Sequence, residues 1–301
     1  MAKNEEAFFM SKNKKSKKLE TIMTPKEIDK KNYEGIGFFL IDKTMKIPKV
    51  TVDRRGFLTD TFKDEVSAEV LEKIILEGTA AANIPLKQVR KHAMSCIKKV
   101  KSISTSESAL TGLPGGPVGI TAGIAVDVTQ FYSNLINLIQ KLCYLYGMKD
   151  IKSMDDIKDE NKTAACIVLI FIGVASGIHG LENAAKTAFK VLSGHYVKLS
   201  SKLILFSKPA FYSVAKKVAK SIGVSISKKG FAKAASKTVP VIGAVISAGL
   251  NWATFTPMAN KLRYCLEDEY RNMLKNPSSE SIIEEIEKVI NEYQSGKNDG
   301  I

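Results

Sequence analysis

The glycine-rich segment 112–117 (GLPGGP) has a composition that could bind a ligand. Glycine-rich loops ahead of helices can bind phosphate through backbone N–H groups and the helix dipole. No Gly-Lys-Ser or Gly-Lys-Thr occurs here and no convincing strand precedes the loop, so it matches neither a P-loop nor a dinucleotide-binding fingerprint. We therefore expect a structural turn between two closely packed helices. The residues that would form it are Gly112, Pro114, Gly115 and Gly116.

A polar stripe follows this loop on the predicted helix 121–146. Asp127, Gln130, Asn134 and Asn137 are three or four positions apart, so they share one helix face. The simplest interpretation is a solvent-facing stripe. A buried Asp127 would instead have to be paired or hydrogen-bonded, and we expect such a residue to stabilise the fold. No second acid or His lies at a matching helical spacing, so a catalytic role for Asp127 is the weakest interpretation.

The histidines and cysteines show no catalytic or metal-binding pattern. The sequence has no G-x-S-x-G nucleophile elbow, no CxxC and no Cys/His cluster. We therefore expect a non-enzymatic protein without cofactor or metal. An uncharacterised enzyme with a site near Asp127 and His179 stays open as an alternative.

The excess of positive charge comes from one stretch of the chain. The net charge is +14, and the segment 183–266 contains thirteen Lys, one Arg and no Asp or Glu. Such asymmetry indicates a polyanionic partner. Proteins that read DNA bases favour Arg, and the only Arg here is Arg263. An anionic membrane is therefore the preferred partner, and nonspecific nucleic-acid binding is a weaker alternative.

Residues 209–222 (PAFYSVAKKVAKSI) are the most informative part of this basic segment. Ala215, Val218 and Ile222 form an apolar stripe that Phe211 extends, beside a cluster of lysines. A basic amphipathic helix suits an anionic membrane surface, although a core helix with a solvated lysine face is the simpler alternative. The residues expected to bind the membrane or another anion are Lys198, Lys202, Lys208, Phe211, Lys216, Lys217, Lys220, Lys228, Lys229, Lys233 and Lys237.

Three uncharged or nearly uncharged segments are about as long as a membrane-spanning helix, which needs about 20 mostly apolar residues. They are 108–126, 163–181 and 238–260, and each is interrupted by Gly, Pro or polar residues. We expect buried core helices. The alternative is a pore-forming effector in which 163–181 and 238–260 insert as hairpin segments.

The remaining patterns predict an all-α, multi-helix globular bundle with long, weakly polar central helices. Segments 37–41 and 49–52 are β-like and predict a small N-terminal β-ribbon, and Gly147 is expected to end the helix 121–146. The expected organisation is a disordered basic tail (1–20), an N-terminal extension with the ribbon (21–60), a helical domain (61–295) and a disordered C-terminus (296–301). The N-terminal lysines precede no apolar region, so we expect a cytoplasmic protein, peripheral to the inner face of the cell membrane.

Several of these motifs together resemble the EcsC protein family. They are residues 110–116 (LTGLPGG), Asp127, residues 145–147 (LYG) and residues 239–244 (VPVIGA), and the likeness covers roughly 65–275. The resemblance implies an all-helical, membrane-associated protein accessory to a transport or defence process, with no active site to carry over. We expect structural roles for Pro240 and Gly243. An oligomer and a membrane protein complex are the further partners left open.

Overall fold

The computed structural model describes residues 33–48, 50–111, 117–150, 160–193, 209–226 and 252–275. Within these ranges the chain forms helices and no strand, which confirms the all-α prediction. The helices are α2 (Tyr33–Met45), α3 (Arg54–Phe62), α4 (Ala68–Glu77), α5 (Leu86–Thr111), α6 (Pro117–Leu145), α7 (Glu160–Ala175), α8 (Glu182–Leu192), α9 (Pro209–Ile226) and α12 (Trp252–Lys275).

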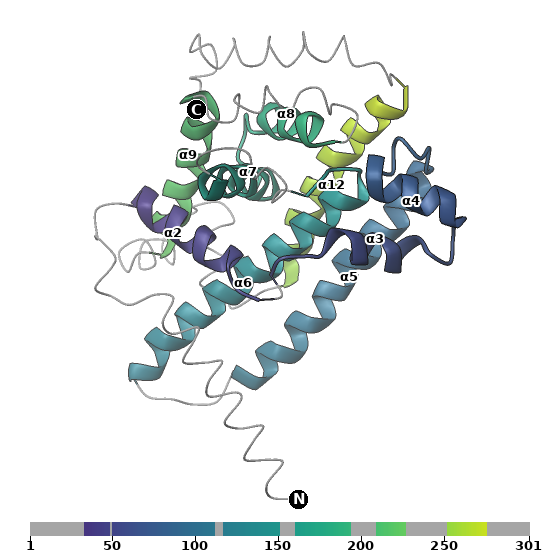
Figure 1. Ribbon diagram of the computed structural model, residues 1–301. Coiled ribbons are helices and arrows are strands. Elements are labelled where there is room, and N and C mark those ends of the chain that lie inside the picture. The colour runs from purple at the N-terminus through teal and green to yellow at the C-terminus, as the bar shows by residue number, and fades with distance from the viewer. Residues whose placement is uncertain are drawn as a thin grey trace, which may run out of the picture.

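Helix α7 lies at the centre of the bundle. It contacts α2, α6, α8, α9 and α12, and Figure 1 shows α2 and α9 on one side of it and α12 on the other. Every residue from Ala165 to Ala175 is buried, as expected for an apolar helix surrounded by others. The segment 163–181 therefore contributes a core helix in this structure. Among the described helices, none has the length and apolar character needed to cross a membrane.

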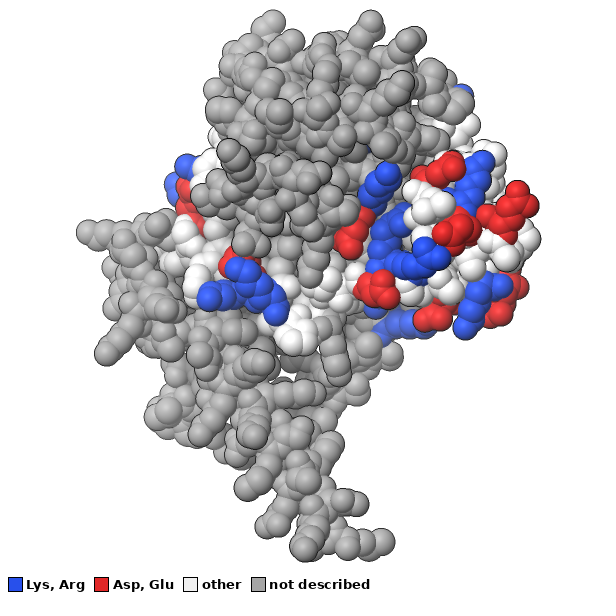
Figure 2. Space-filling view, viewed as in Figure 1, with Lys and Arg blue, Asp and Glu red and all other residues white. Residues whose placement is uncertain are grey.

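Helices α5 and α6 lie side by side and run in opposite directions, and α3 and α4 pack near the start of α5 (Figure 1). Figure 2 shows that charged side chains of both signs alternate over this side of the molecule. The boundary expected between residues 60 and 61 falls inside α3.

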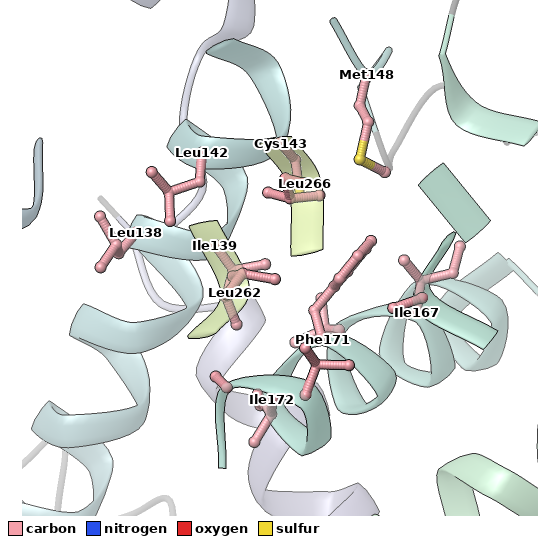
Figure 3. Packing of buried hydrophobic residues seen from close by; sticks show 14 of the residues in the cluster. Leu138, Ile139, Leu142, Cys143, Met148, Ile167, Phe171, Ile172, Leu262 and Leu266 are labelled. Carbon is pink, nitrogen blue, oxygen red and sulfur yellow. The ribbon is translucent and has the colours of Figure 1, made fainter. Parts of the chain in front are cut away.

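The hydrophobic core joins α6, α7 and α12. Figure 3 shows Leu138 and Leu142 of α6, Phe171 of α7, and Leu262 and Leu266 of α12 in this cluster. Each of these side chains is at most 1% exposed. Burying one such side chain contributes about 1.5–3 kcal/mol, so this contact holds the three helices together.

The predicted β-ribbon is wrong for the residues that the structure describes. Segment 37–41 lies inside α2, because Ile36, Leu40 and Ile41 form a helical stripe that is buried in the core. In the second segment, residues 50–52 lie in a turn, and the side chain of Gln140 hydrogen-bonds to the backbone of Val50 and Val52. The Gln140 amide donates to the Val50 carbonyl (2.9 Å) and accepts from the Val52 N–H (3.2 Å), where a partner strand was expected.

Helices α2 and α9 approach so closely that glycine is required at their contact. A Cβ on Gly37 would lie 2.0 Å from the carbonyl oxygen of Ala219, and a Cβ on Gly223 would lie 1.8 Å from that of Tyr33. No real Cβ tolerates such a distance to backbone, so both positions accept only glycine in this arrangement. The backbone of α9 is therefore placed directly against α2.

Gly147 follows the end of α6 with a φ of 97°, the left-handed conformation that glycine adopts easily. The Met148 N–H donates to the Cys143 carbonyl and the Gly147 N–H to the Tyr144 carbonyl, which is a Schellman motif. Gly147 was expected at the end of this helix, and the turn brings its backbone against Gly78, the C-cap residue of α4.

Candidate anion-binding surface

Helix α9 provides the described part of the predicted membrane-binding segment. It begins at Pro209, whose fixed φ suits a first helical position. Ala215, Val218 and Ile222 are fully buried, and the helix packs on α2 and α7. The apolar stripe therefore faces the protein core, and α9 is a core helix with a solvated lysine face.

The opposite side of α9 is exposed to solvent. We call Tyr212, Lys217, Lys220 and Val224 the α9 face. Tyr212 and Val224 are each 38% exposed, so the lysines lie between an aromatic and an aliphatic side chain that water reaches. The α9 face therefore combines two lysines with an aromatic and an aliphatic side chain on the solvent-exposed side of the helix.

Tyr212 is held in place by neighbours on both sides. Its ring stacks on Phe38 of α2, with 5.6 Å between ring centroids. The ammonium group of Lys216 lies 4.8 Å from the centroid of the Tyr212 ring and 3.3 Å from a carboxylate oxygen of Glu34. Lys216 is thus occupied by local contacts, and the cations left for a partner are Lys217 and Lys220.

In the folded protein, some lysines and arginines of the acid-free segment are paired with carboxylates from elsewhere in the chain. Carboxylates from outside the acid-free segment reach four of its cations: Glu34 pairs with Lys216, Glu267 with Arg263, and Glu269 with Lys186 (3.8 Å) and Lys190 (3.5 Å).

Among the described residues no ion pair involves Lys217 or Lys220. These two lysines therefore carry the exposed positive charge on the described part of α9. They distinguish the α9 face from the mixed-charge side seen in Figure 2.

A buried ion-pair cluster joins α5, the C-terminal end of α6 and α12 around Glu267, which is 1% exposed. Arg90 donates to its carboxylate through Nη2 (2.7 Å) and Nε, the Tyr146 hydroxyl donates from 3.0 Å, and Arg263 donates as well. Burial acts to raise the pKa of Glu267, but the hydrogen bonds from Arg90 and Arg263 outweigh it and the pKa is lowered. Glu267 is therefore a carboxylate that connects three helices.

Sequence reasoning missed this cluster. Arg263 and Glu267 are four positions apart on one helix, a spacing that favours ion pairing, and this was the available signal. The contributions of Arg90 and Tyr146 arise from positions 177 and 121 residues away from Glu267, and only the fold brings them together.

A second charged cluster is centred on Glu65, which follows α3. Its carboxylate accepts from Gln88 (2.8 Å), Lys91 (3.0 Å) and, at 2.8 Å, contacts Nε2 of His92. These contacts lower the pKa of Glu65 to about 2, and the hydrogen bond from Gln88 has the largest effect. The His92 ring also packs edge-on against Phe62, so His92 connects α5 to α3.

Among the described residues, His179, Cys166 and Cys265 lie outside both charged clusters. His179 is exposed in the turn after α7. Burial raises the pKa of the Cys166 and Cys265 thiols to about 12, so both are inert apolar side chains. Within the described part of the chain no three His, Cys, Asp or Glu side chains are grouped to hold a metal.

The structure does not describe the side chains of several predicted site residues, and others lie outside the described ranges. Asp127 is on α6 and Phe211 on α9, but their side chains are not described. The others are Gly112, Pro114, Gly115, Gly116, Lys198, Lys202, Lys208, Lys228, Lys229, Lys233, Lys237, Pro240 and Gly243.

Comparisons with protein-family models, curated proteins and solved structures give no match to this chain. Its function is therefore inferred from its own residues and geometry.

Proposed function

We propose that the protein is a non-enzymatic helical protein that docks on an anionic membrane surface through the α9 face. The observation that carries the proposal is the pair Lys217 and Lys220. Both are exposed, no carboxylate among the described residues pairs with them, and Tyr212 and Val224 flank them on the same helix. On this proposal the protein is peripheral to the inner face of the cell membrane.

The physical forces available at this face are adequate for reversible binding. A lysine close to an anionic bilayer contributes about 1 kcal/mol, and the contribution decreases with salt. A tyrosine adds affinity at headgroup depth, where its ring is apolar and its hydroxyl stays hydrated. The acid-free composition of 183–266 supplies further lysines on the same stretch of chain.

The resemblance of residues 65–275 to the EcsC family supports the same proposal, because it implies a membrane-associated accessory protein. We extend the proposal to a role beside a transport or defence process, with a membrane protein complex as a further partner.

Vesicle flotation tests the proposal directly. We expect the wild-type protein to float with phosphatidylglycerol vesicles at low salt, to lose binding at high salt, and to ignore phosphatidylcholine vesicles. The variant Lys217→Glu/Lys220→Glu should bind at least about tenfold more weakly, since it replaces attraction with repulsion at two positions.

A matched control changes the same charge elsewhere. Lys73 and Lys87 are exposed on α4 and α5. Lys73→Glu/Lys87→Glu should therefore bind almost as well as wild type. Equal loss of binding in both double variants would show that net charge alone acts, and equal flotation of wild type with neutral vesicles would overturn the proposal.

Dye release from the same vesicles separates docking from insertion. Insertion of 163–181 would require α7 to leave the core and expose its buried residues from Ala165 to Ala175. We expect binding without leakage. Leakage at saturating binding would instead support the pore-forming alternative.

A further inference from the structure

A second cationic surface lies at the solvent edge of the Glu267 cluster. Arg90 and Arg271 border the buried carboxylate, and their side chains are 42% and 43% exposed. They come from α5 and α12, so the edge is formed where two long helices meet. It is distinct from the α9 face, which α9 forms beside α2.

The carboxylate of Glu267 is already saturated with donors. Arg90, Arg263 and the Tyr146 hydroxyl all bond to it. Nη2 of Arg271 lies 3.6 Å from the same carboxylate, beyond hydrogen-bond distance. The hydrogen-bonded partner of Arg271 is Asp268, at 2.7 Å.

The cluster carries more positive than negative charge. Three guanidinium groups surround Glu267, and Asp268 is the one further acid bonded to them among the described residues. Arg263 is buried, so the excess positive charge is exposed at Arg90 and Arg271. Among the described residues no hydrogen bond involves Nη1 of Arg90.

The two exposed guanidinium groups are close enough to share one small anion. Their Nη2 atoms lie 2.7 Å and 3.6 Å from the same oxygen of Glu267. A guanidinium presents paired donors that fit the oxygens of a phosphate group, and two such groups can bind different oxygens of one phosphate. The ring of Tyr264 is 58% exposed and lies against Arg263, so this part of α12 is open to solvent.

We propose that Arg90 and Arg271 form a binding site for a phosphate group at the edge of the Glu267 cluster. The chemistry fits a free phosphate compound or the headgroup of a phosphomonoester lipid. The hydrogen bonds from Arg90 to Glu267 fix the position of the Arg90 guanidinium group. Asp268 competes with the incoming anion for Arg271.

Titration with inorganic phosphate tests the site. Phosphate should raise the melting temperature above that in sodium chloride of equal ionic strength, and calorimetry should give a saturable isotherm. Arg271→Ala removes a half-exposed side chain and should weaken phosphate binding about tenfold, the usual loss for one hydrogen bond to a charged group. Arg55→Ala is the matched control, because Arg55 is an exposed arginine paired with Glu72 on α4, and it should bind like wild type.

Asp268→Asn distinguishes a phosphate-binding site from a cluster that only stabilises the fold. This variant removes a competing carboxylate from Arg271, so phosphate should bind more tightly than to wild type. Phosphatidic acid vesicles, used with Lys217→Glu/Lys220→Glu to remove the α9 face, distinguish a lipid headgroup from a free compound. No stabilisation beyond the chloride control, or unchanged affinity in Arg271→Ala and Asp268→Asn, would overturn the proposal.

Discussion

Helices α9 and α12 both carry cations from the acid-free segment, but in opposite settings. Arg263 of α12 is buried and bonded to Glu267, whereas Lys217 and Lys220 of α9 are exposed, with no ion pair among the described residues. Net charge in the sequence does not distinguish these cases. Only the positions of carboxylates from outside the segment separate a cation that stabilises the fold from one that is available to a partner.

The largest expected effect is at Glu267. Glu267→Gln leaves Arg263 buried without its counter-charge, so we expect a loss of about 3–5 kcal/mol in the free energy of unfolding, measured in denaturant. Asp268→Asn, at an exposed neighbouring position, should cost less than about 1 kcal/mol. Similar small losses in both variants would remove the distinction between buried and exposed charges on α12.

The next effect concerns the placement of α9. Gly223→Ala puts a methyl group 1.8 Å from the Tyr33 carbonyl oxygen, so α2 and α9 must move apart. We expect a loss of at least about 1–3 kcal/mol, from overpacking, in the same unfolding measurement. At Gly56 the nearest atom is the carboxylate end of Asp53, a side chain that can move, and Gly56→Ala should be nearly neutral. If Gly223→Ala unfolds like wild type, the close contact of α9 with α2 is not required.

A pH effect is expected from Glu65, whose pKa is lowered to about 2. Because its pKa is lower in the folded than in the unfolded state, its contribution is complete above about pH 4.5 and is lost as the pH falls toward 2. The side chain is 28% exposed, so we expect under about 1 kcal/mol. The stability difference between wild type and Glu65→Gln should shrink between pH 6 and pH 3. A difference that stays constant with pH would contradict this assignment.

The smallest effect on stability is expected at the α9 face. Lys217→Glu/Lys220→Glu alters exposed side chains, so the free energy of unfolding should change by no more than about 0.5 kcal/mol per substitution. The same variant should lose vesicle binding. A large loss of stability would show that these lysines belong to the fold, as Arg263 does.

The sequence allowed the helical class and the core role of 163–181 to be predicted, because apolar periodicity and length suffice for both. It misassigned segment 37–41, where five residues with β-like composition can equally form a buried helix face. The contact with α9 favours the helix, because the backbone of α2 packs closely against Ala219 and Gly223 of α9. Local composition contains no information about that partner.

The candidate site was predicted in part for a similar reason. The lysines at 217 and 220 followed from composition, and their exposure from helical spacing. The pairing of Lys216 with Glu34, and of Lys190 with Glu269, depends on contacts between distant helices and could not be derived from spacing. The Glu267 cluster was missed for the same reason, because its residues come from distant positions in the sequence.

On the proposed membrane docking, the glycine contact between α2 and α9 would also determine how the α9 face meets a bilayer. A basic segment that folds only on binding gives up conformational entropy at that step. The α9 face is already helical, and Gly37 and Gly223 place its backbone directly against α2. Far-UV circular dichroism should therefore show no gain of helix from α9 on vesicle binding. The long axis of α9 would lie parallel to the bilayer and give the whole molecule one orientation on it.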